Sequence, residues 1–328
     1  MLRWGILGTA KIARERLVPA IHASNNGTLM GIASRTQQSA DAFAQAHGIP
    51  LAFPTYEAML ASDAIDAVYI PLPTSQHVEW TKKVLAAGKH VLCEKPISLH
   101  ASEVDQLIAA RNKSGKVAAE AFMVTYHPQW IKVRDLLAEG AIGKLRHIQG
   151  SFTYFNRDPD NMRNKPELGG GGLLDIGVYP TVTSRFVTGQ EPKRALATLE
   201  RDPAFGTDIF ANCQYQFDGF DMSFYCSTQL AARQSMIFHA DQGFIEINAP
   251  FNAEIFDAVT VTLSNQAHNS AQSWSFNATQ QYTLQVEAFG RKVAGDMVDL
   301  FTLENSKKNQ AAIDALFASG ESGDWESV

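Results

Sequence analysis

The sequence predicts a chain of two domains in the α/β class: a doubly wound parallel sheet first, then a mostly antiparallel sheet with helices. Short apolar runs alternate with helical patterns up to about residue 121, which is typical of a parallel sheet with right-handed crossovers. The later residues hold longer stretches of β-type alternation. At 328 residues the chain is long enough for two hydrophobic cores.

The first domain, residues 1–121, is predicted from six apolar runs and the helical patterns between them. A glycine turn ends the first run and leads into a helix. Pro71 and Pro73 close the fourth run, and Gly88 stops the helix that follows it. The expected strands are 2–7, 29–33, a short element around 52, 66–70, 90–93 and 117–121, with helices to about 23 and over 37–47, 56–61, 76–87 and 101–113.

The second domain, residues 122–328, has a different sequence pattern, with long stretches of β character. Asp218-Gly219 stands between two runs of alternating pattern and predicts a β-hairpin. The expected strands are 145–155, 194–201, 208–217, 222–229, 236–239, 244–248 and 259–263, and the expected helices are 129–139, 282–303 and 309–318. We therefore expect an α+β domain with a mostly antiparallel sheet.

Composition and charge exclude several classes of protein. The net charge is −6, and the two basic doublets, Lys82-Lys83 and Lys307-Lys308, are not interleaved with aromatic residues, so no nucleic-acid partner is expected. Three cysteines without CxxC spacing and nine histidines without a His-x-x-x-His pair argue against disulfides and a metal site. No apolar run approaches membrane-spanning length, and no signal-peptide pattern opens the chain. We expect a cytoplasmic protein without a membrane partner.

The turn after the first strand has the form of a dinucleotide site. The pattern Gly-x-Gly-x-x-Gly/Ala supplies a tight turn, close approach of the pyrophosphate and close helix packing. Here it reads Gly8-x-Ala10-x-x-Ala13, without the middle glycine. An ordinary tight turn is the alternative, but a strand before it and a helix after it favour a Rossmann domain. The expected cofactor contacts in this turn are Gly8, Thr9, Ala10, Lys11 and Ile12.

The end of the second strand predicts which nicotinamide cofactor binds. NAD calls for an acidic residue that accepts hydrogen bonds from the ribose hydroxyls. This chain has Ser34-Arg35 and no acid between Leu29 and Ala40. A guanidinium suits a phosphate and can stack on adenine. NADP is therefore favoured over NAD, and a solvated arginine is the alternative interpretation.

Two stretches hold candidate catalytic residues. Lys95 lies between Glu94 and Pro96 after the fifth strand, and Asp175 and Tyr179 follow a run of four glycines. If residues 175–179 are helical, the two side chains share one face. A tyrosine beside a lysine can exchange a proton with a hydroxyl or carbonyl oxygen at neutral pH. The alternatives are a structural lysine, a core tyrosine and a helix-capping aspartate.

With these motifs the chain resembles the glucose-fructose oxidoreductase / inositol dehydrogenase (Gfo/Idh/MocA) family over nearly its whole length. Its dimeric dihydrodiol dehydrogenases, NADP-linked xylose dehydrogenases and anhydrofructose reductases look most similar. The resemblance implies that the second domain has a large open sheet, which covers the nicotinamide and pairs with another subunit in a homodimer or larger oligomer. The stretches that carry it are Trp4–Thr9, Ala33–Arg35, Glu94–Pro96, Glu120–Met123, Tyr126–Gln129 and Gly169–Tyr179.

The resemblance also implies roles for further residues. Glu94 would contact the nicotinamide ribose, and Leu72, Pro73 and His77 would line the nicotinamide pocket. Asn161 and Arg163 would line the substrate entrance. His127 and Tyr282 would form part of the substrate wall, with packing as their alternative role.

Together these features predict an NADP-dependent oxidoreductase. It would move a hydride between the nicotinamide and a carbinol or carbonyl carbon of a sugar, a cyclic polyol or a trans-dihydrodiol. Tyr179 would carry the hydroxyl proton, and Lys95 would stabilise developing alkoxide charge. The alternatives are an enzyme that uses tightly held cofactor for net non-redox chemistry, and a non-catalytic NADP-binding regulatory protein.

Overall fold

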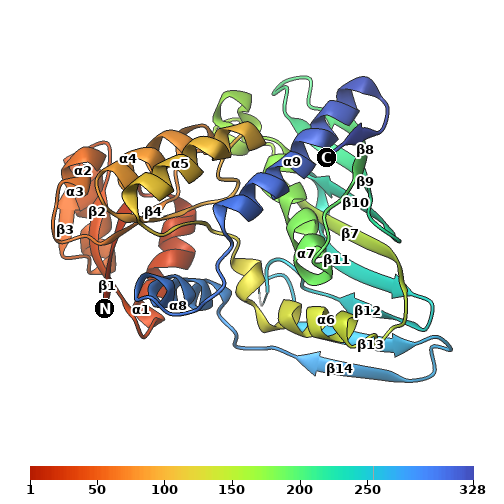
Figure 1. Cartoon of the computed structure of the whole chain (residues 1–328). Coiled ribbons are helices and arrows are strands. Elements are labelled where there is room, and N and C mark those ends of the chain that lie inside the picture. The colour runs from red at the N-terminus through yellow and green to blue at the C-terminus, as the bar shows by residue number, and fades with distance from the viewer. Residues whose placement is uncertain (254) are drawn as a thin grey trace. The chain divides into compact units, whose positions relative to one another are not determined.

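The computed structural model describes residues 1–253 and 255–328 and contains one six-stranded and one nine-stranded sheet (Figure 1). Two compact units are present. Unit 1 comprises Met1–Met123 and Gln280–Lys307, and unit 2 comprises Val124–Thr279 and Lys308–Val328. The predicted division into functional domains between residues 121 and 122 stays a prediction. Unit 1 also contains the later segment Gln280–Lys307, which the prediction assigned to the second domain.

Unit 1 contains the parallel sheet, in the strand order β3-β2-β1-β4-β5-β6. This order places the first strand in the middle, as in dinucleotide-binding domains. The strands are β1 Leu2–Leu7, β2 Gly27–Ala33, β3 Leu51–Phe53, β4 Ala67–Ile70, β5 His90–Cys93 and β6 Ala118–Glu120. The helices are α1 Val18–Ala23, α2 Gln37–His47, α3 Tyr56–Leu60, α4 His77–Ala86, α5 Val104–Ser114 and α8 Gln281–Val293.

The six-stranded sheet has a hydrophobic core on each face, because side chains alternate along every strand. On one face Trp4 of β1 packs with α1, α2 and α8, and its ring centroid lies 5.1 Å from that of Phe289. On the other face Leu7 of β1 packs with residues of α3, α4 and α5. A parallel sheet covered on both sides is the predicted architecture, and it is confirmed.

Unit 2 contains the larger sheet, in the order β14-β13-β12-β11-β7-β10-β9-β8-β15. Its pairs are antiparallel except for β10 with β7. The expected hairpin joins β9 and β10, with Gly219 at φ +89°. The strands are β7 Leu145–Phe155, β8 Arg194–Arg201, β9 Asp208–Gln216, β10 Asp221–Ser227, β11 Gln229–Ala240, β12 Gly243–Ile247, β13 Thr260–Asn265, β14 Ala271–Ser275 and β15 Glu326–Ser327. The helices are α6 Pro128–Ala138, α7 Val178–Thr188 and α9 Leu303–Ser322, whose first residues belong to unit 1.

The predicted helix 282–303 is wrong in its second half. Helix α8 ends at Val293, and Gly295 follows with φ +99°. A left-handed glycine ends a helix, because the N–H of Asp296 then turns back to the carbonyl of Arg291. Within the described residues, no helix is long and apolar enough to cross a membrane.

Candidate functional site

The turn after β1 is as tight as the sequence predicts. Gly8 has φ +89°, and its N–H donates to the carbonyl of Ala33 at 2.7 Å. A methyl group at Gly8 would come within 3.2 Å of Leu72 Cδ2. The turn leads directly into helical residues, where the carbonyl of Ala10 accepts from the N–H of Arg14 at 3.1 Å. Its backbone can therefore approach an anionic group at the carboxyl edge of the sheet.

Arg35 lies exposed at the end of β2, while the neighbouring Ser34 is buried. The phenol of Tyr56 lies near both the Gly8 turn and Arg35. A methyl group at Gly8 would be 3.4 Å from the Tyr56 hydroxyl, and Arg35 partly offsets the rise in the pKa of Tyr56 that burial causes. An exposed cation beside the dinucleotide turn suits a phosphate group.

Glu94 is held in place at the end of β5. Its N–H donates to the carbonyl of Ile70 at 3.0 Å, and its carboxylate accepts a short hydrogen bond from the buried hydroxyl of Tyr69. The same carboxylate accepts the N–H of Lys95 at 3.3 Å. Burial and the charge of Glu94 raise the pKa of Tyr282, so this tyrosine of α8 lies near Glu94 within unit 1.

His77 connects the turns that follow β4 and β5. Its ring is buried, with Nδ1 2.7 Å from the carbonyl oxygen of Pro96 and Nε2 2.7 Å from that of Leu72. Both ring nitrogens thus have protein partners. His77 thus contacts the backbone of Leu72 and of Pro96, and its place in a nicotinamide pocket stays a prediction.

In unit 2, Asp175 and Tyr179 lie on one continuous helix, as the sequence predicts. The π-helical segment η7, Leu173–Gly177, runs directly into α7. The N-cap residue of this helix is Gly172, so Asp175 is not the capping residue. Tyr179 is buried against a stacked pair of phenylalanines, with ring centroids 5.5 Å from Phe152 and 5.6 Å from Phe251.

The carboxylate of Asp175 joins two side chains from outside the helix. Its Oδ2 accepts hydrogen bonds from the hydroxyl of Tyr154 and from Nε of Arg163, both at 2.7 Å. Asp175 raises the pKa of Arg163 most strongly, and the nearby Tyr179 raises it further. Arg163, which the resemblance placed at the substrate entrance, is therefore an ion-pair partner of Asp175 beside Tyr179.

The glycine run explains how Arg163 reaches this helix. A methyl group at Gly170 would lie 2.5 Å from the backbone oxygen of Arg163. The same oxygen accepts the N–H of Gly171 at 2.9 Å. Only glycine allows the two backbones to lie so close.

Sequence reasoning missed Tyr154. It is the penultimate residue of β7. Burial is the main cause that raises the pKa of Tyr154, and the charge of Asp175 raises it as well. The sequence predicted a strand over 145–155, but not which of its residues lies opposite the helix.

Asn161 and His127 have local structural contacts. The side chain of Asn161 accepts the N–H of Arg163 at 3.1 Å and so begins a short turn. His127 is fully buried at the start of α6, where its Nδ1 accepts the N–H of Gln129 at 3.2 Å. Burial lowers the pKa of His127 to about 4, so its ring is neutral at physiological pH.

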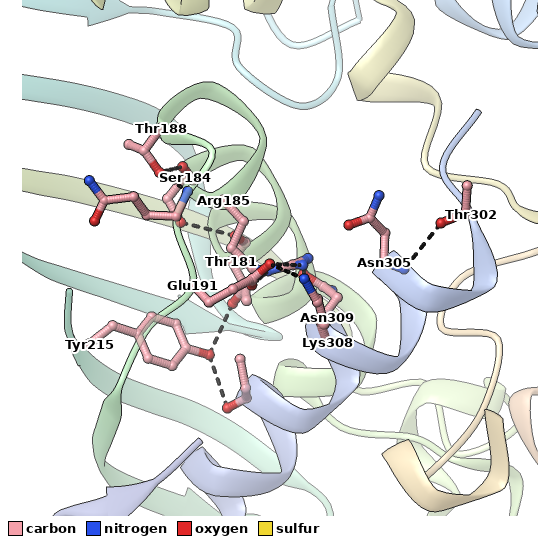
Figure 2. A network of polar contacts seen from close by, with 12 residues as sticks. Thr181, Ser184, Arg185, Thr188, Glu191, Tyr215, Thr302, Asn305, Lys308 and Asn309 are labelled. Atoms are coloured by element: carbon pink, nitrogen blue, oxygen red, sulfur yellow. Dashed lines mark hydrogen bonds and ion pairs between the residues drawn. The ribbon is translucent and has the colours of Figure 1, made fainter. Parts of the chain in front are cut away.

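The C-terminal half of α7 is anchored by a polar network. Figure 2 shows Arg185 and Glu191 close to Lys308 and Asn309 of α9. Arg185 donates to Glu191 at 2.5 and 3.1 Å and to Asn309 at 3.2 Å, and Lys308 lies 3.3 Å from Glu191. The hydroxyl of Tyr215 donates to a carbonyl of α9 at 3.1 Å.

Comparison with protein-family models identifies the class of protein to which this chain belongs. One protein-family model, described as an oxidoreductase family with an NAD-binding Rossmann fold, matches residues 2–122. A second, the GFO/IDH/MocA C-terminal domain, matches residues 130–246. The chain is thus an oxidoreductase with a nicotinamide-dinucleotide domain, and it belongs to the GFO/IDH/MocA family.

Relatives match over the full length. An uncharacterized oxidoreductase of Rhizobium meliloti is 37% identical, covering 100% of this chain and 99% of its own. The NADP(+) D-xylose 1-dehydrogenase 2 of Haloferax volcanii is 32% identical over 98% of both chains. The crystal structure of a 3-ketoreductase from Actinomadura kijaniata in complex with NADP and TDP-benzene has a TM-score of 0.90 at 30% identity, over 97% of both chains.

These relatives confirm the predicted family, fold and oxidoreductase class. They also confirm a nicotinamide cofactor of the NADP type, since NADP is named for both the xylose dehydrogenase and the ketoreductase. The individual site residues stay predictions.

Proposed function

We propose that this chain is an NADP-dependent sugar or polyol oxidoreductase. It moves a hydride between the nicotinamide and a carbinol or carbonyl carbon of a small polyhydroxylated substrate: a sugar, a cyclic polyol or a trans-dihydrodiol. The observation that carries the proposal is the Asp175–Arg163 ion pair beside Tyr179, on a helix of a chain whose other unit is a dinucleotide domain. Relatives named as a D-xylose dehydrogenase and a trans-dihydrobenzenediol dehydrogenase support this substrate class.

The residues of unit 1 fit the cofactor. The Gly8–Ile12 turn would hold the pyrophosphate, because its glycine is in a conformation that favours close backbone approach. Arg35 would bind the 2′-phosphate, since Ser34 and not an acid precedes it. Glu94, oriented by Tyr69, would bind the nicotinamide ribose. Bound NADP supplies the hydride acceptor or donor, and Leu72 and Pro73 would line its pocket.

Tyr179 is proposed as the group that gives the proton in reduction and takes it in oxidation. A phenol has an ordinary pKa near 10, so it needs nearby positive charge to work at neutral pH. Arg163 supplies part of that charge within unit 2. Lys95 is proposed to act on the same substrate oxygen and to stabilise its alkoxide form. Asp175 holds Arg163 and thereby sets the local charge.

A panel of aldoses, inositols, dihydrodiols and α-dicarbonyls tests the proposal, with nicotinamide absorbance followed in both directions. Turnover that produces or consumes free NADPH is expected with at least one class. Product formed without release of reduced cofactor would favour the net non-redox alternative. Tight NADP binding without turnover on any class would favour the non-catalytic alternative.

We also propose a cytoplasmic homodimer or larger homo-oligomer, joined through the face of the nine-stranded sheet that α6 and α7 do not cover. Phe210 and Tyr225, both half-exposed, stack on neighbouring strands with ring centroids 6.2 Å apart. Half-exposed stacked aromatics suit a protein interface. The three cysteines are buried as free thiols, which suits a reducing compartment.

A further inference from the structure

We propose that Asp208 is a positioning residue for the reaction: its carboxylate fixes the first turn of the helix that carries Asp175 and Tyr179. The catalytic consequence rests on the proposed function, whereas the structural role of Asp208 does not. Asp208 is the first residue of β9, and no motif in the sequence singles it out.

The carboxylate of Asp208 caps the helix from a distant part of the chain. Its Oδ2 accepts the N–H of Leu173, the first residue of η7, at 2.7 Å across a separation of 35 residues. The first N–H groups of a helix have no partner within the helix, and its N-terminus attracts negative charge. The N-cap residue Gly172 has no side chain to fill this role, so the cap comes from β9.

The glycines before the helix make room for this carboxylate. A methyl group at Gly171 would lie 2.0 Å from Asp208 Oδ1, closer than any real contact. Gly171 also has φ +118°, a conformation that other residues rarely adopt. A methyl group at Gly172 would lie 3.3 Å from Asp208 Oδ2. The absence of side chains in the glycine run therefore leaves space for the carboxylate of Asp208 as well as for the backbone of Arg163.

The effect of Asp208 is confined to the N-terminal end of the helix. The opposite end is fixed independently, by Arg185 with Glu191 and Asn309 (Figure 2). Asp175 lies in the first turn and donates its own N–H to the carbonyl of Gly171 at 3.1 Å. Loosening the first turn would thus move the carboxylate that holds Arg163 while the rest of α7 stays in place.

The charge of Asp208 agrees with a capping role. Burial raises the pKa of Asp208 to about 6, while the backbone N–H groups of Leu173 and Asp208 itself, and the charge of Arg201, oppose that rise. The group is therefore a carboxylate at neutral pH. Among the described residues, the buried thiols of Cys213 and Cys226 also lie within electrostatic reach of Asp208.

Asp208→Asn is the direct test, and Asp202→Asn is its matched control. Both aspartates are 2% exposed. Asp202 accepts the N–H of Ala204 at 2.8 Å and Nε2 of Gln229 at 2.7 Å, and none of its hydrogen bonds among the described residues reaches the helix. The control therefore removes a buried, hydrogen-bonded charge from the same unit without touching the first turn.

Two measurements are made on each full-length variant. In Asp208→Asn, hydrogen exchange should become at least about tenfold faster in peptides over 171–179 and stay unchanged over 183–188, because only the first turn loses its cap. Its kcat should fall roughly 10²-fold, the usual effect of a misplaced reacting group, while its Kd for NADPH stays within about twofold. Asp202→Asn should keep both properties. An unchanged exchange rate or kcat in Asp208→Asn, or an equal loss in Asp202→Asn, overturns the proposal.

A double-mutant cycle separates positioning from general damage. In a Tyr179→Phe background the proton-transfer group is already absent, so Asp208→Asn should cost far less of the remaining kcat than it does in the wild type. An equal loss in both backgrounds would overturn the positioning role. If the wild type transfers no hydride to any substrate, the proposed function fails, and hydrogen exchange alone decides the role of Asp208.

Gly172→Ala provides a second variant should Asp208→Asn not fold. Gly172 has helical angles, φ −71° and ψ −40°, so alanine fits its backbone, and the added methyl presses on Asp208 alone among charged groups. Faster exchange over 171–179 and a kcat reduced about three- to tenfold are expected. Wild-type values of both would overturn the proposal.

Discussion

At the scale of single residues, Asp175 is the centre of a charged group inside unit 2. It binds Arg163 and Tyr154 through the same oxygen, and Tyr179 lies within electrostatic reach of Arg163. The arginine thereby comes to lie near the phenol that is proposed to transfer the proton. In the proposed mechanism the positive charge of Arg163 would stabilise the deprotonated form of Tyr179, and the Asp175 carboxylate on the same guanidinium offsets part of that charge.

Tyr179→Phe keeps the ring packed against Phe152 and Phe251 but removes the ionisable hydroxyl. Turnover should fall by roughly 10²–10⁴-fold, the usual contribution of a general acid or base, with little change in cofactor affinity. Tyr154→Phe is the control, because it removes a hydroxyl that bonds Asp175 but is not proposed to transfer the proton. In steady-state kinetics, the loss of turnover in Tyr154→Phe should be much smaller than that in Tyr179→Phe. Near-normal turnover in Tyr179→Phe would remove the tyrosine from the mechanism.

Arg35 is predicted to set the cofactor preference. NADP should bind at least tenfold more tightly than NAD, about 1.4 kcal/mol, and Arg35→Ala should remove most of that difference. Fluorescence titration with both cofactors measures it. Arg134→Ala, on exposed surface of α6 in the other unit, should leave both affinities unchanged. Equal affinities in the unmodified protein would contradict the NADP assignment.

At the scale of elements, β6 supports the turn that bears Lys95. Glu120 at the end of β6 is buried, and its Oε1 accepts the N–H of Ile97 at 2.9 Å. The pKa of Glu120 is raised to about 7, mainly by burial and in small part by the charge of Glu94, while hydrogen bonds from Ser306 and the Ile97 N–H and the charge of Lys95 oppose the rise. This carboxyl group therefore titrates in the physiological range.

The pH dependence of stability follows from Glu120. Its folded pKa lies above the unfolded value near 4.3, so its contribution is fully present below pH 4 and is lost as pH rises through 7. From pH 5 to pH 8 the wild type should lose about 2–3 kcal/mol of unfolding free energy relative to Glu120→Gln. Denaturant unfolding at both values measures it. Exposed Glu139→Gln should show no such pH-dependent difference; equal pH slopes in the wild type and Glu120→Gln would refute the role of Glu120.

Local elements were predictable from the sequence, and contacts between distant elements were not. The Gly8 turn, the helix 37–47 and the Asp218-Gly219 hairpin each follow from residues next to one another. The predicted helix 282–303 failed because its periodic pattern continued past Gly295, whose left-handed backbone ends α8. Asp175 was a candidate, but its partner Tyr154 lies 21 residues away on β7, and spacing alone could not bring the two together.

At the scale of the whole molecule, the proposed oligomer would be joined through the nine-stranded sheet. We expect sedimentation velocity at micromolar concentration to show a dimer or larger oligomer. Tyr225→Asp, which puts a charge into the Phe210–Tyr225 stack, should shift the protein toward the monomer, since burying an unpaired charge is costly. Arg134→Ala should sediment as the wild type does. A monomeric wild type would contradict the proposed oligomer.

The division of unit 1 into two chain segments has a consequence for biosynthesis. Trp4 is among the first residues to leave the ribosome, whereas Phe289 and Val286, which fill the same core, are made near the end. The side chain of Asn26 likewise donates to the carbonyl of Glu287 at 2.8 Å. The nascent nucleotide-binding unit therefore cannot complete its core until about 160 residues of the other unit have been translated. During that time part of its apolar core stays exposed. Chaperone contact during synthesis should accordingly begin early and end only after residue 293 has emerged.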